Sequence, residues 1–500
     1  MQKVFVAVAV AAALLTARPF AQAPAPAAAP AAPVSLEAVA KALGASKGLT
    51  QIQFSATGSN NAYGQAWKAD MPWPAFKIYS YTATVDYAVP AMRIDLQRTN
   101  PDATPVRGGG GLPLLAPQQQ IQAISGKVAW NLVPSATGGA PAVQPQPAAV
   151  ADRTLYLWTL TPQGVIKAAM ANNATIAGRF ISFKIGDTAV KATVGANNLI
   201  ASVRTVGDAA VLGDVTTETT FSNYEETKGV KFPMRIVQKQ GGFPILDLTV
   251  ATVRPQSNVT IDIPSVAAAA AATATPTPAA LRVDTQKVAD GIYYLTGGSH
   301  HSVAVEFKDY VVLIEAPQTD ERAVAVFDAV KKQIPNKPIR YVVNSHNHFD
   351  HLGGVRAAMA EGYTIVTHAS NVAYYQRIAA MPHTVSPDRL SKSPKKPVIE
   401  GVVDKRVFSD DTNTLELYRV STDHNDAMLV AYLPKAKLLV EADMWNPPAA
   451  NAPPAAAINP VTVQLVDSIK KLNLDVQQIA GLHGRLATIQ ELRAAAGQSS

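Results

Sequence analysis

Three histidines and an aspartate fall within six residues of this chain, in the segment His346-Asn347-His348-Phe349-Asp350-His351. The apolar run 340–344 precedes this segment, and Gly353-Gly354 and a helical stretch follow it. We therefore expect a loop at the end of a buried strand, where sites of layered α/β folds usually lie. Three imidazoles and a carboxylate this close together have no ordinary packing role, so the segment predicts a metal site.

The spacing within the segment predicts how the side chains divide between metal ions. In an extended stretch, His346 and His348 point to the same side and can bind one ion together. Asp350 and His351, where the chain turns into the helix, can reach a neighbouring ion. Because the chain contains no cysteine, zinc would be held by imidazole and carboxylate alone.

Zinc takes about four ligands, so the segment by itself is incomplete. The residues that can complete it each lie at or next to a transition from strand to loop: His424, Asp443 and His483. Taken singly, His424 or His483 would be an ordinary loop histidine and Asp443 a turn residue. Together with the cluster they form a plausible ligand set for two ions.

The C-terminal part, 281–500, alternates strand and helix. Apolar runs predict strands at 292–295, 303–307, 310–315, 339–344, 364–367, 428–433 and 437–441. Helical spacing predicts helices at 319–334, 461–472 and 486–496. The order strand, helix, strand over 310–344 predicts a crossover connection in an α/β domain.

The N-terminal part, 35–265, has short alternating segments separated by turn residues, which predicts a β-rich domain. It contains no histidine and no cluster that points to chemistry. An Ala/Pro tether at 24–34 and an Ala/Thr/Pro linker at 266–280 lack the side chains to build a core. They separate the two predicted domains.

The first 23 residues predict a cleaved signal peptide and a periplasmic or secreted protein. Lys3 precedes the apolar run 4–15, and Ala21-Gln22-Ala23 fits a cleavage site after Ala23. The apolar run is shorter than the ~20 residues that a membrane span needs, and no later stretch is long enough. We therefore expect no stable insertion into a membrane.

The net charge of +7 comes from scattered residues. The densest basic cluster, Lys392, Lys395 and Lys396, lies among prolines and serines, which is typical of a solvated loop. We expect a small-molecule substrate and no nucleic acid. The sequence gives no indication of the oligomeric state.

Over about 281–500 the chain resembles the metallo-β-lactamase fold superfamily. The resemblance rests on HNHFDH, on the histidine of STDHNDAMLVAYLP, on the aspartate of LLVEADMW and on the histidine of GLHG, in that order. It implies a four-layer αββα sandwich with the site at one edge of the sheets. It also implies that the first zinc is bound by His346, His348 and His424, the second by Asp350, His351 and His483, and both by Asp443.

The resemblance makes Asp350 and Asp443 the expected catalytic carboxylates. Asp443 places the chain nearer to the glyoxalase II, lactonase, phosphodiesterase and sulfatase members than to the true β-lactamases, which lack that bridging aspartate. Glu315 stands where many members have aspartate and is expected to support a metal ligand. The N-terminal part resembles the open β-barrels of periplasmic lipoprotein-carrier proteins.

Four further residues are candidates for supporting a ligand or contacting substrate: His301, Glu315, His368 and Trp445. His300 and His301 lie in a loop between two expected strands, and of this pair we expect His301 to contact substrate. His368 ends a strand at the same edge as the metal loop, and Trp445 follows Asp443 closely enough to wall a pocket.

The predicted function is an exported binuclear zinc hydrolase that cleaves a small-molecule ester, lactone, thioester, phosphodiester or related bond. The alternatives are a ligand- or lipid-binding protein acting through the N-terminal domain, a β-lactamase, a nuclease and a di-iron redox protein. The signal peptide argues against a nuclease, and the chain has no flavin-binding pattern to accompany a di-iron site.

Overall fold

The structure is a computed structural model that describes residues 34–45, 48–135, 139–273, 281–450, 452 and 457–498. The predicted signal peptide at 1–23, with its cleavage site after Ala23, lies outside the described residues. So do residues 24–33 of the predicted tether and residues 274–280 of the predicted linker.

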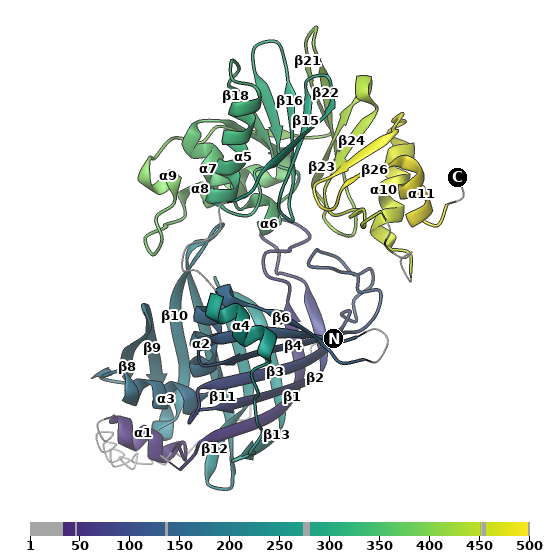
Figure 1. Ribbon diagram of the computed structural model, residues 1–500. Coiled ribbons are helices and arrows are strands. Elements are labelled where there is room, and N and C mark those ends of the chain that lie inside the picture. Colours follow the sequence, from purple (N-terminus) through teal and green to yellow (C-terminus); the bar gives the residue numbers. More distant parts are fainter. Residues whose placement is uncertain are drawn as a thin grey trace, which may run out of the picture. The chain divides into compact units, whose positions relative to one another are not determined.

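The N-terminal part is dominated by one 13-stranded antiparallel sheet (Figure 1). Its strands pair in the order β6-β5-β4-β3-β2-β1-β13-β12-β11-β10-β9-β8-β7. They are β1 (Gln51–Asn61), β2 (Ala75–Asp86), β3 (Ala91–Thr99), β4 (Gln118–Ser125), β5 (Val128–Val133), β6 (Ala142–Pro145), β7 (Thr175–Ala177), β8 (Phe180–Ile185), β9 (Thr188–Val194), β10 (Ile200–Ala209), β11 (Gly213–Thr227), β12 (Val230–Gln240) and β13 (Phe243–Pro255).

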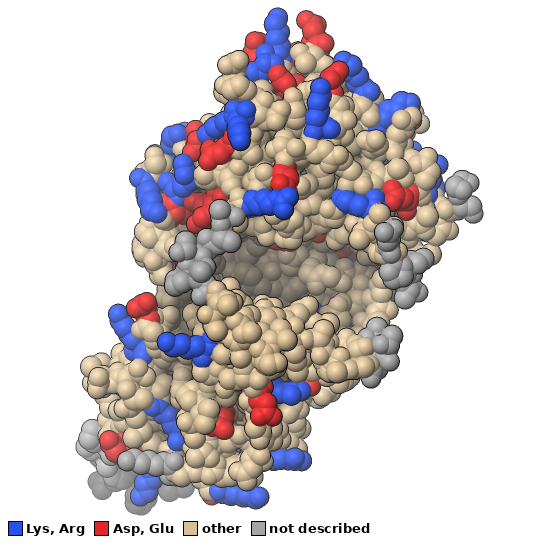
Figure 2. Space-filling view, viewed as in Figure 1, with Lys and Arg blue, Asp and Glu red and all other residues tan. Residues whose placement is uncertain are grey.

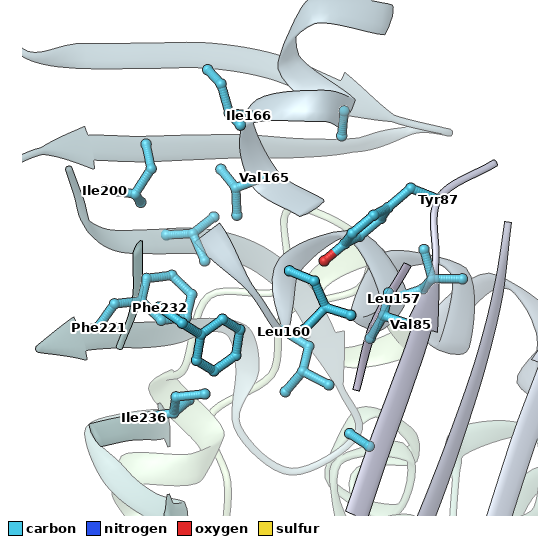
Figure 3. Close-up of a cluster of buried hydrophobic side chains, with 14 of the residues drawn as sticks. Val85, Tyr87, Leu157, Leu160, Val165, Ile166, Ile200, Phe221, Phe232 and Ile236 are labelled. Carbon is cyan, nitrogen blue, oxygen red and sulfur yellow. The ribbon is translucent and has the colours of Figure 1, made fainter. Parts of the chain in front are cut away.

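Helices α1 (Leu36–Ala42), α2 (Val150–Thr159) and α3 (Pro162–Ala171) supply the other half of this domain's core. Alternation along the strands puts one set of apolar side chains on the helix side of the sheet, where Phe232 and Ile236 are fully buried. Leu160 and Val165 meet them from the helices (Figure 3). The predicted β-rich N-terminal part is thus confirmed. The likeness to carrier barrels stays a prediction, because among the described residues no ladder joins the edge strands β6 and β7.

The alanine-rich segment after the sheet contains a helix. Residues Ser265–Thr273 form α4, and Ala267 packs with Ala123 and Trp130 of the sheet. Alanine has the highest intrinsic helix propensity and loses no side-chain entropy in a helix, which explains why this run is ordered where we expected a linker. Residues 34–500 belong to one compact unit.

The C-terminal part contains two sheets. The seven-stranded sheet has the order β14-β15-β16-β17-β18-β19-β20, and the six-stranded sheet runs from β21 to β26 in sequence. The strands are β14 (Asp284–Ala289), β15 (Ile292–Thr296), β16 (Ser302–Glu306), β17 (Val311–Ile314), β18 (Ile339–Val343), β19 (Thr364–His368), β20 (Ile399–Val402), β21 (Lys405–Ser409), β22 (Thr414–Val420), β23 (Met428–Leu433), β24 (Leu438–Glu441), β25 (Gln478–Gly481) and β26 (Leu486–Thr488).

Helices cover the outer faces of both sheets (Figure 1). They are α5 (Asp320–Gln333), α6 (Phe349–Leu352), α7 (Val355–Glu361), α8 (Val372–Ala380), α9 (Arg389–Lys392), α10 (Pro460–Lys471) and α11 (Ile489–Ala495). Strands β17 and β18 are parallel and joined by α5, which confirms the expected crossover. Apolar residues of both sheets, such as Val305 and Val430, share the central core. This arrangement confirms the four-layer αββα sandwich.

Basic and acidic side chains are interspersed over the visible face of the molecule (Figure 2). A few ion pairs join neighbouring strands, such as Arg204 with Glu218 at 2.7 Å. Within the described part of the chain, no helix is long and apolar enough to cross a bilayer.

Candidate metal centre

The metal loop, residues 344–351, begins directly after β18 and ends in the short helix α6. Asn344 continues the sheet through its amide, which donates to the carbonyl of Val366 at 2.9 Å. The loop then turns sharply against the segment after β17. A Cβ on Gly353 would lie 1.8 Å from the carbonyl oxygen of Gln318, so glycine permits this close approach.

All seven predicted ligands lie together at the end of the two sheets. Together with His300, they form two groups of donor atoms, and within each group all atoms lie within 4.8 Å of one another. The first group is His346, His348, His424 and Asp443, and the second is His300, Asp350, His351 and His483. Strand ends more than 100 residues apart in sequence converge here because they share one edge of the sandwich.

In the first group, four buried atoms make no well-formed hydrogen bond among the described residues, although Asp443 Oδ2 lies 2.7 Å from His351 Nε2. They are His346 Nε2, His348 Nδ1, His424 Nε2 and Asp443 Oδ2. Buried polar atoms are rarely left unpaired, so this set needs an explanation. Burial, followed by the charge of His351, lowers the pKa of His346 to about 4. A neutral imidazole is the form that binds a metal, so these residues fit one.

Hydrogen bonds at the far ring nitrogens orient these histidines. His346 Nδ1 lies 3.0 Å from Ser345 Oγ, and His348 Nε2 lies 3.0 Å from the carbonyl oxygen of Ala66. Since a carbonyl only accepts, His348 must carry its proton on Nε2, and its Nδ1 is left free toward the cluster. Such outer contacts fix both tautomer and ring orientation of metal-binding histidines.

The second group is built around His351 and His483. Their Nε2 atoms lie 3.0 Å apart and point at the same place. His483 Nδ1 donates to the carbonyl of Ser299 at 3.1 Å, which leaves Nε2 free. Asp350 Oδ2 lies 3.1 Å from His300 Nε2 and 3.9 Å from His351 Nε2. Both carboxylate and imidazole ligands for a second ion are therefore available.

Asp443 lies between the two groups. Its Oδ2 is 2.7 Å from His351 Nε2 and 3.3 Å from His346 Nε2, and its Oδ1 is 3.1 Å from His483 Nε2. The residue has a φ of 61°, in the left-handed region that aspartate tolerates better than most residues. The amides of Met444 and Trp445 donate to Glu441 Oε2 and hold this turn.

Glu315 connects the two groups from below the metal loop and is fully buried. Its Oε2 accepts from His351 Nδ1 at 3.0 Å and from Ser345 Oγ at 2.6 Å, while Oε1 accepts from Asn344 Nδ2. Because Ser345 in turn contacts His346, one carboxylate positions a histidine of each group. This geometry matches the supporting role expected for Glu315.

The other candidates lie elsewhere. His301 Nε2 donates to the carbonyl of Gly298, and its Nδ1 faces the hydroxyl of Tyr294. His368 caps the short helix Ala369–Asn371 through Ser370, so it belongs to neither donor group. Trp445 lies in the central apolar core. Among the described residues, none of these three side chains hydrogen-bonds to a donor of either group.

His300 joins the second group, although the sequence favoured its neighbour His301. The two histidines are adjacent in a loop, and nothing in the local pattern shows which one turns toward Asp350. Strand β16 begins at Ser302, and the amide of His301 donates to the carbonyl of Leu482. That backbone bond fixes the loop so that His300 faces the metal loop.

A cavity of about 380 Å³ opens beside Asp350. Its walls include Tyr63, Asp208, Gln318 and Phe349, so both parts of the chain contribute to it. The Tyr63 hydroxyl is buried and has no hydrogen-bond partner among the described residues. Desolvation, with a smaller contribution from Asp208, raises the pKa of Tyr63 to about 12, so its hydroxyl stays protonated at neutral pH.

Comparison with known families supports the resemblance. A family model described as the metallo-beta-lactamase superfamily matches residues 295–443. That segment holds every predicted ligand except His483. A linear primary-alkylsulfatase from Pseudomonas sp is 32% identical over 101 residues, which is 20% of this chain and 14% of the relative. The match thus spans about a seventh of that enzyme's length.

Two solved structures are similar to part of this chain. A metallo-beta-lactamase from Pontibacter korlensis has 17% identity and a TM-score of 0.33, covering 43% of this chain and 98% of its own. A stereoselective inverting sec-alkylsulfatase from Pseudomonas sp. has 20% identity and a TM-score of 0.31, covering 43% and 40%.

Proposed function

We propose that this chain, whose residues 295–443 form a metallo-β-lactamase superfamily domain, is a binuclear zinc hydrolase of a small-molecule ester. The match to that superfamily supports a hydrolase with a metal site. The number of ions, their identity and the kind of ester are our proposal. Among the possible substrates, we propose sulfate esters as the first class to test.

The observation that carries this proposal is the pair of donor groups on either side of Asp443. Each group supplies four donor atoms, which is the number that zinc prefers. All the donors are imidazole nitrogens or carboxylate oxygens, and the chain has no cysteine that could direct the site toward another chemistry. We assign His346, His348 and His424 to the first ion, Asp350, His351 and His483 to the second, and Asp443 to both. His300, the fourth member of the second group, is assigned to the hydrogen bond with Asp350 Oδ2 at 3.1 Å.

Zinc bound by these residues would lower the pKa of a water molecule to about 7 and so supply hydroxide at neutral pH. The residues of the chain supply the rest. Asp350 stands where the cavity meets the second donor group, so it can orient the attacking water or accept its proton.

The cavity and the relatives guide the substrate proposal. A volume of about 380 Å³ is at the small end of the range for ligand pockets. Aromatic walls from Tyr63 and Phe349 suit an apolar leaving group. The 32% identical relative is an alkylsulfatase, which directs attention to sulfate esters of such groups. Lactones, thioesters, phosphodiesters and β-lactams are the competing substrates.

The test measures metal and turnover on the same preparation. Protein purified without chelator should contain zinc approaching two equivalents per chain by elemental analysis. A panel of alkyl sulfates, lactones, thioesters, phosphodiesters and β-lactams should then show hydrolysis that chelation removes and zinc restores. Folded protein with no bound transition metal would contradict the proposal. Turnover of β-lactams alone would leave a hydrolase but change the substrate class.

We also propose that the protein is exported to the periplasm or beyond, on the basis of residues 1–23. Edman sequencing of the mature protein should begin at Pro24, because Ala21-Gln22-Ala23 fits a cleavage site. A mature protein that retains Met1 in the exported fraction would argue against cleavage.

A further inference from the structure

The loop between β1 and β2, residues 62–74, lies against the metal loop. Its backbone is bonded to the C-terminal part at several points. The amide of Phe349 donates to the carbonyl of Gly64 at 3.3 Å, and the amide of Asp426 donates to that of Trp67 at 3.0 Å. The Trp67 indole donates to the carbonyl of Thr422 at 2.8 Å. The loop is thus fixed to both sides of the first donor group.

Gln65 extends from this loop to a predicted ligand of the second ion. Its Nε2 donates to Asp350 Oδ1 at 2.9 Å. Its Oε1 accepts from the amide of Gly110 at 2.8 Å, which fixes which end of the side-chain amide faces Asp350. The other carboxylate oxygen, Oδ2, faces His300 and His351. Gln65 therefore holds one oxygen of Asp350 and turns the other toward the second donor group.

The next residue acts on the first group. The carbonyl oxygen of Ala66 accepts from His348 Nε2 at 3.0 Å and from the side-chain amides of Asn347 and Asn425 at 3.3 Å each. Without this acceptor, His348 could turn or change tautomer. Two adjacent residues of the N-terminal part therefore support one ligand of each ion.

We propose that the N-terminal domain completes the metal centre and that Gln65 is a positioning residue, which holds Asp350 ready for the second ion. This inference rests on the proposed two-metal site. It assigns the domain a part in catalysis that its sequence, without histidines or an acidic cluster, does not indicate. Carboxylates that bind metals are commonly hydrogen-bonded on their free side, and loss of such a partner costs ~10–100-fold in metal affinity or activity.

The packing around Gln65 has little free space. The glycine run 108–111 passes over it, and the amide of Gly109 donates to the Gln65 carbonyl at 3.1 Å. A Cβ on Gly109 would lie 2.2 Å from Gln65 Oε1 and 2.6 Å from His348 Cε1. An added methyl group at position 109 would therefore displace Gln65, His348 or both, without changing either residue.

The experiment uses the full-length protein and Gln65→Met, which keeps the side-chain length but removes the donor. Gln119→Met is the matched control. Gln119 lies in the N-terminal sheet, and its Nε2 also donates to an aspartate, Asp95 Oδ1, at 2.9 Å. Neither residue is near a predicted ligand in the sequence. Zinc affinity is measured by competition with a chromogenic chelator, and folding by urea unfolding of the metal-free proteins.

We expect Gln65→Met to weaken the more weakly held zinc by ~10–100-fold and to lower kcat more than it raises KM. Gln119→Met should retain the zinc affinity and turnover of the unmodified protein. Gly109→Ala should also weaken zinc binding, through Gln65, His348 or both. Gln65→Ala, which removes the same donor, repeats the test if Gln65→Met fails to fold. Unchanged zinc affinity in Gln65→Met and Gly109→Ala, in a protein that binds two zinc ions, would overturn this inference alone. An unmodified protein that binds no zinc would overturn the proposed function, and this inference with it.

Discussion

Asp443→Ala is expected to release metal from both halves of the centre and to lower turnover by more than ~100-fold, beyond the loss from removing a mere supporting contact. The reason is its place between the groups: one carboxylate lies within 3.4 Å of a ring nitrogen of His346, His351, His424 and His483. Elemental analysis and turnover on any substrate found by the panel provide the measurement.

A further variant, Asp443→Asn, separates the role of the Asp443 carboxylate from effects on the backbone. Asp443→Asn keeps the size and tolerates the φ of 61°, whereas alanine adds strain in that left-handed conformation. If metal binding is the cause, Asp443→Asn should lose metal nearly as fully as Asp443→Ala.

His483→Ala should weaken mainly binding of the second ion. Retention of both metals and normal turnover by Asp443→Ala would show that Asp443 is not the bridge, and would favour a site closer to that of the β-lactamases.

Glu315→Ala is expected to lower the free energy of unfolding by roughly 3–5 kcal/mol, as breaking a buried charged pair does. The substitution leaves His351 Nδ1, Ser345 Oγ and Asn344 Nδ2 without their acceptor in a site with no access to water. A buried donor without a partner costs about 1–3 kcal/mol. Urea unfolding of the metal-free protein measures the change.

The same substitution should weaken zinc binding at both positions, because Glu315 orients His351 directly and His346 through Ser345. Glu315→Gln is the matched control: it keeps the volume, but its amide nitrogen cannot accept from these donors. We expect Glu315→Gln to have an intermediate effect on both stability and zinc affinity. A change in unfolding free energy below about 1 kcal/mol for Glu315→Ala would show that the three donors find other partners, and would contradict this account.

The sequence was most informative where the chemistry is local. The metal loop could be predicted because its residues are neighbours in the chain and because an apolar strand precedes it. Apolar periodicity also predicted the crossover between β17 and β18 and the two classes of secondary structure in the two parts. The apolar periodicities of helices and strands follow from the geometry of the backbone, which does not depend on distant contacts.

Two boundary differences have local causes that the apolar pattern did not weigh. The alanine run at Ser265–Thr273 is helical because alanine favours a helix even without a core to cover. At the C-terminus, the segment expected as one helix divides into β26 and α11. The change occurs at Thr488, whose side chain and Glu491 form a capping box that starts the helix.

The sequence by itself predicted the types and order of the proposed ligands and, through the family resemblance, the sandwich that carries them. Only the tertiary structure decided which side chains surround them. His300 rather than His301 faces Asp350, Trp445 is buried in the core, and His368 caps a short helix. Gln65 reaches Asp350 across 285 residues of chain. Local pattern fixes the face of a strand on which a side chain lies, but the neighbour it meets depends on how separate sheets and loops pack, and no short stretch of sequence encodes that.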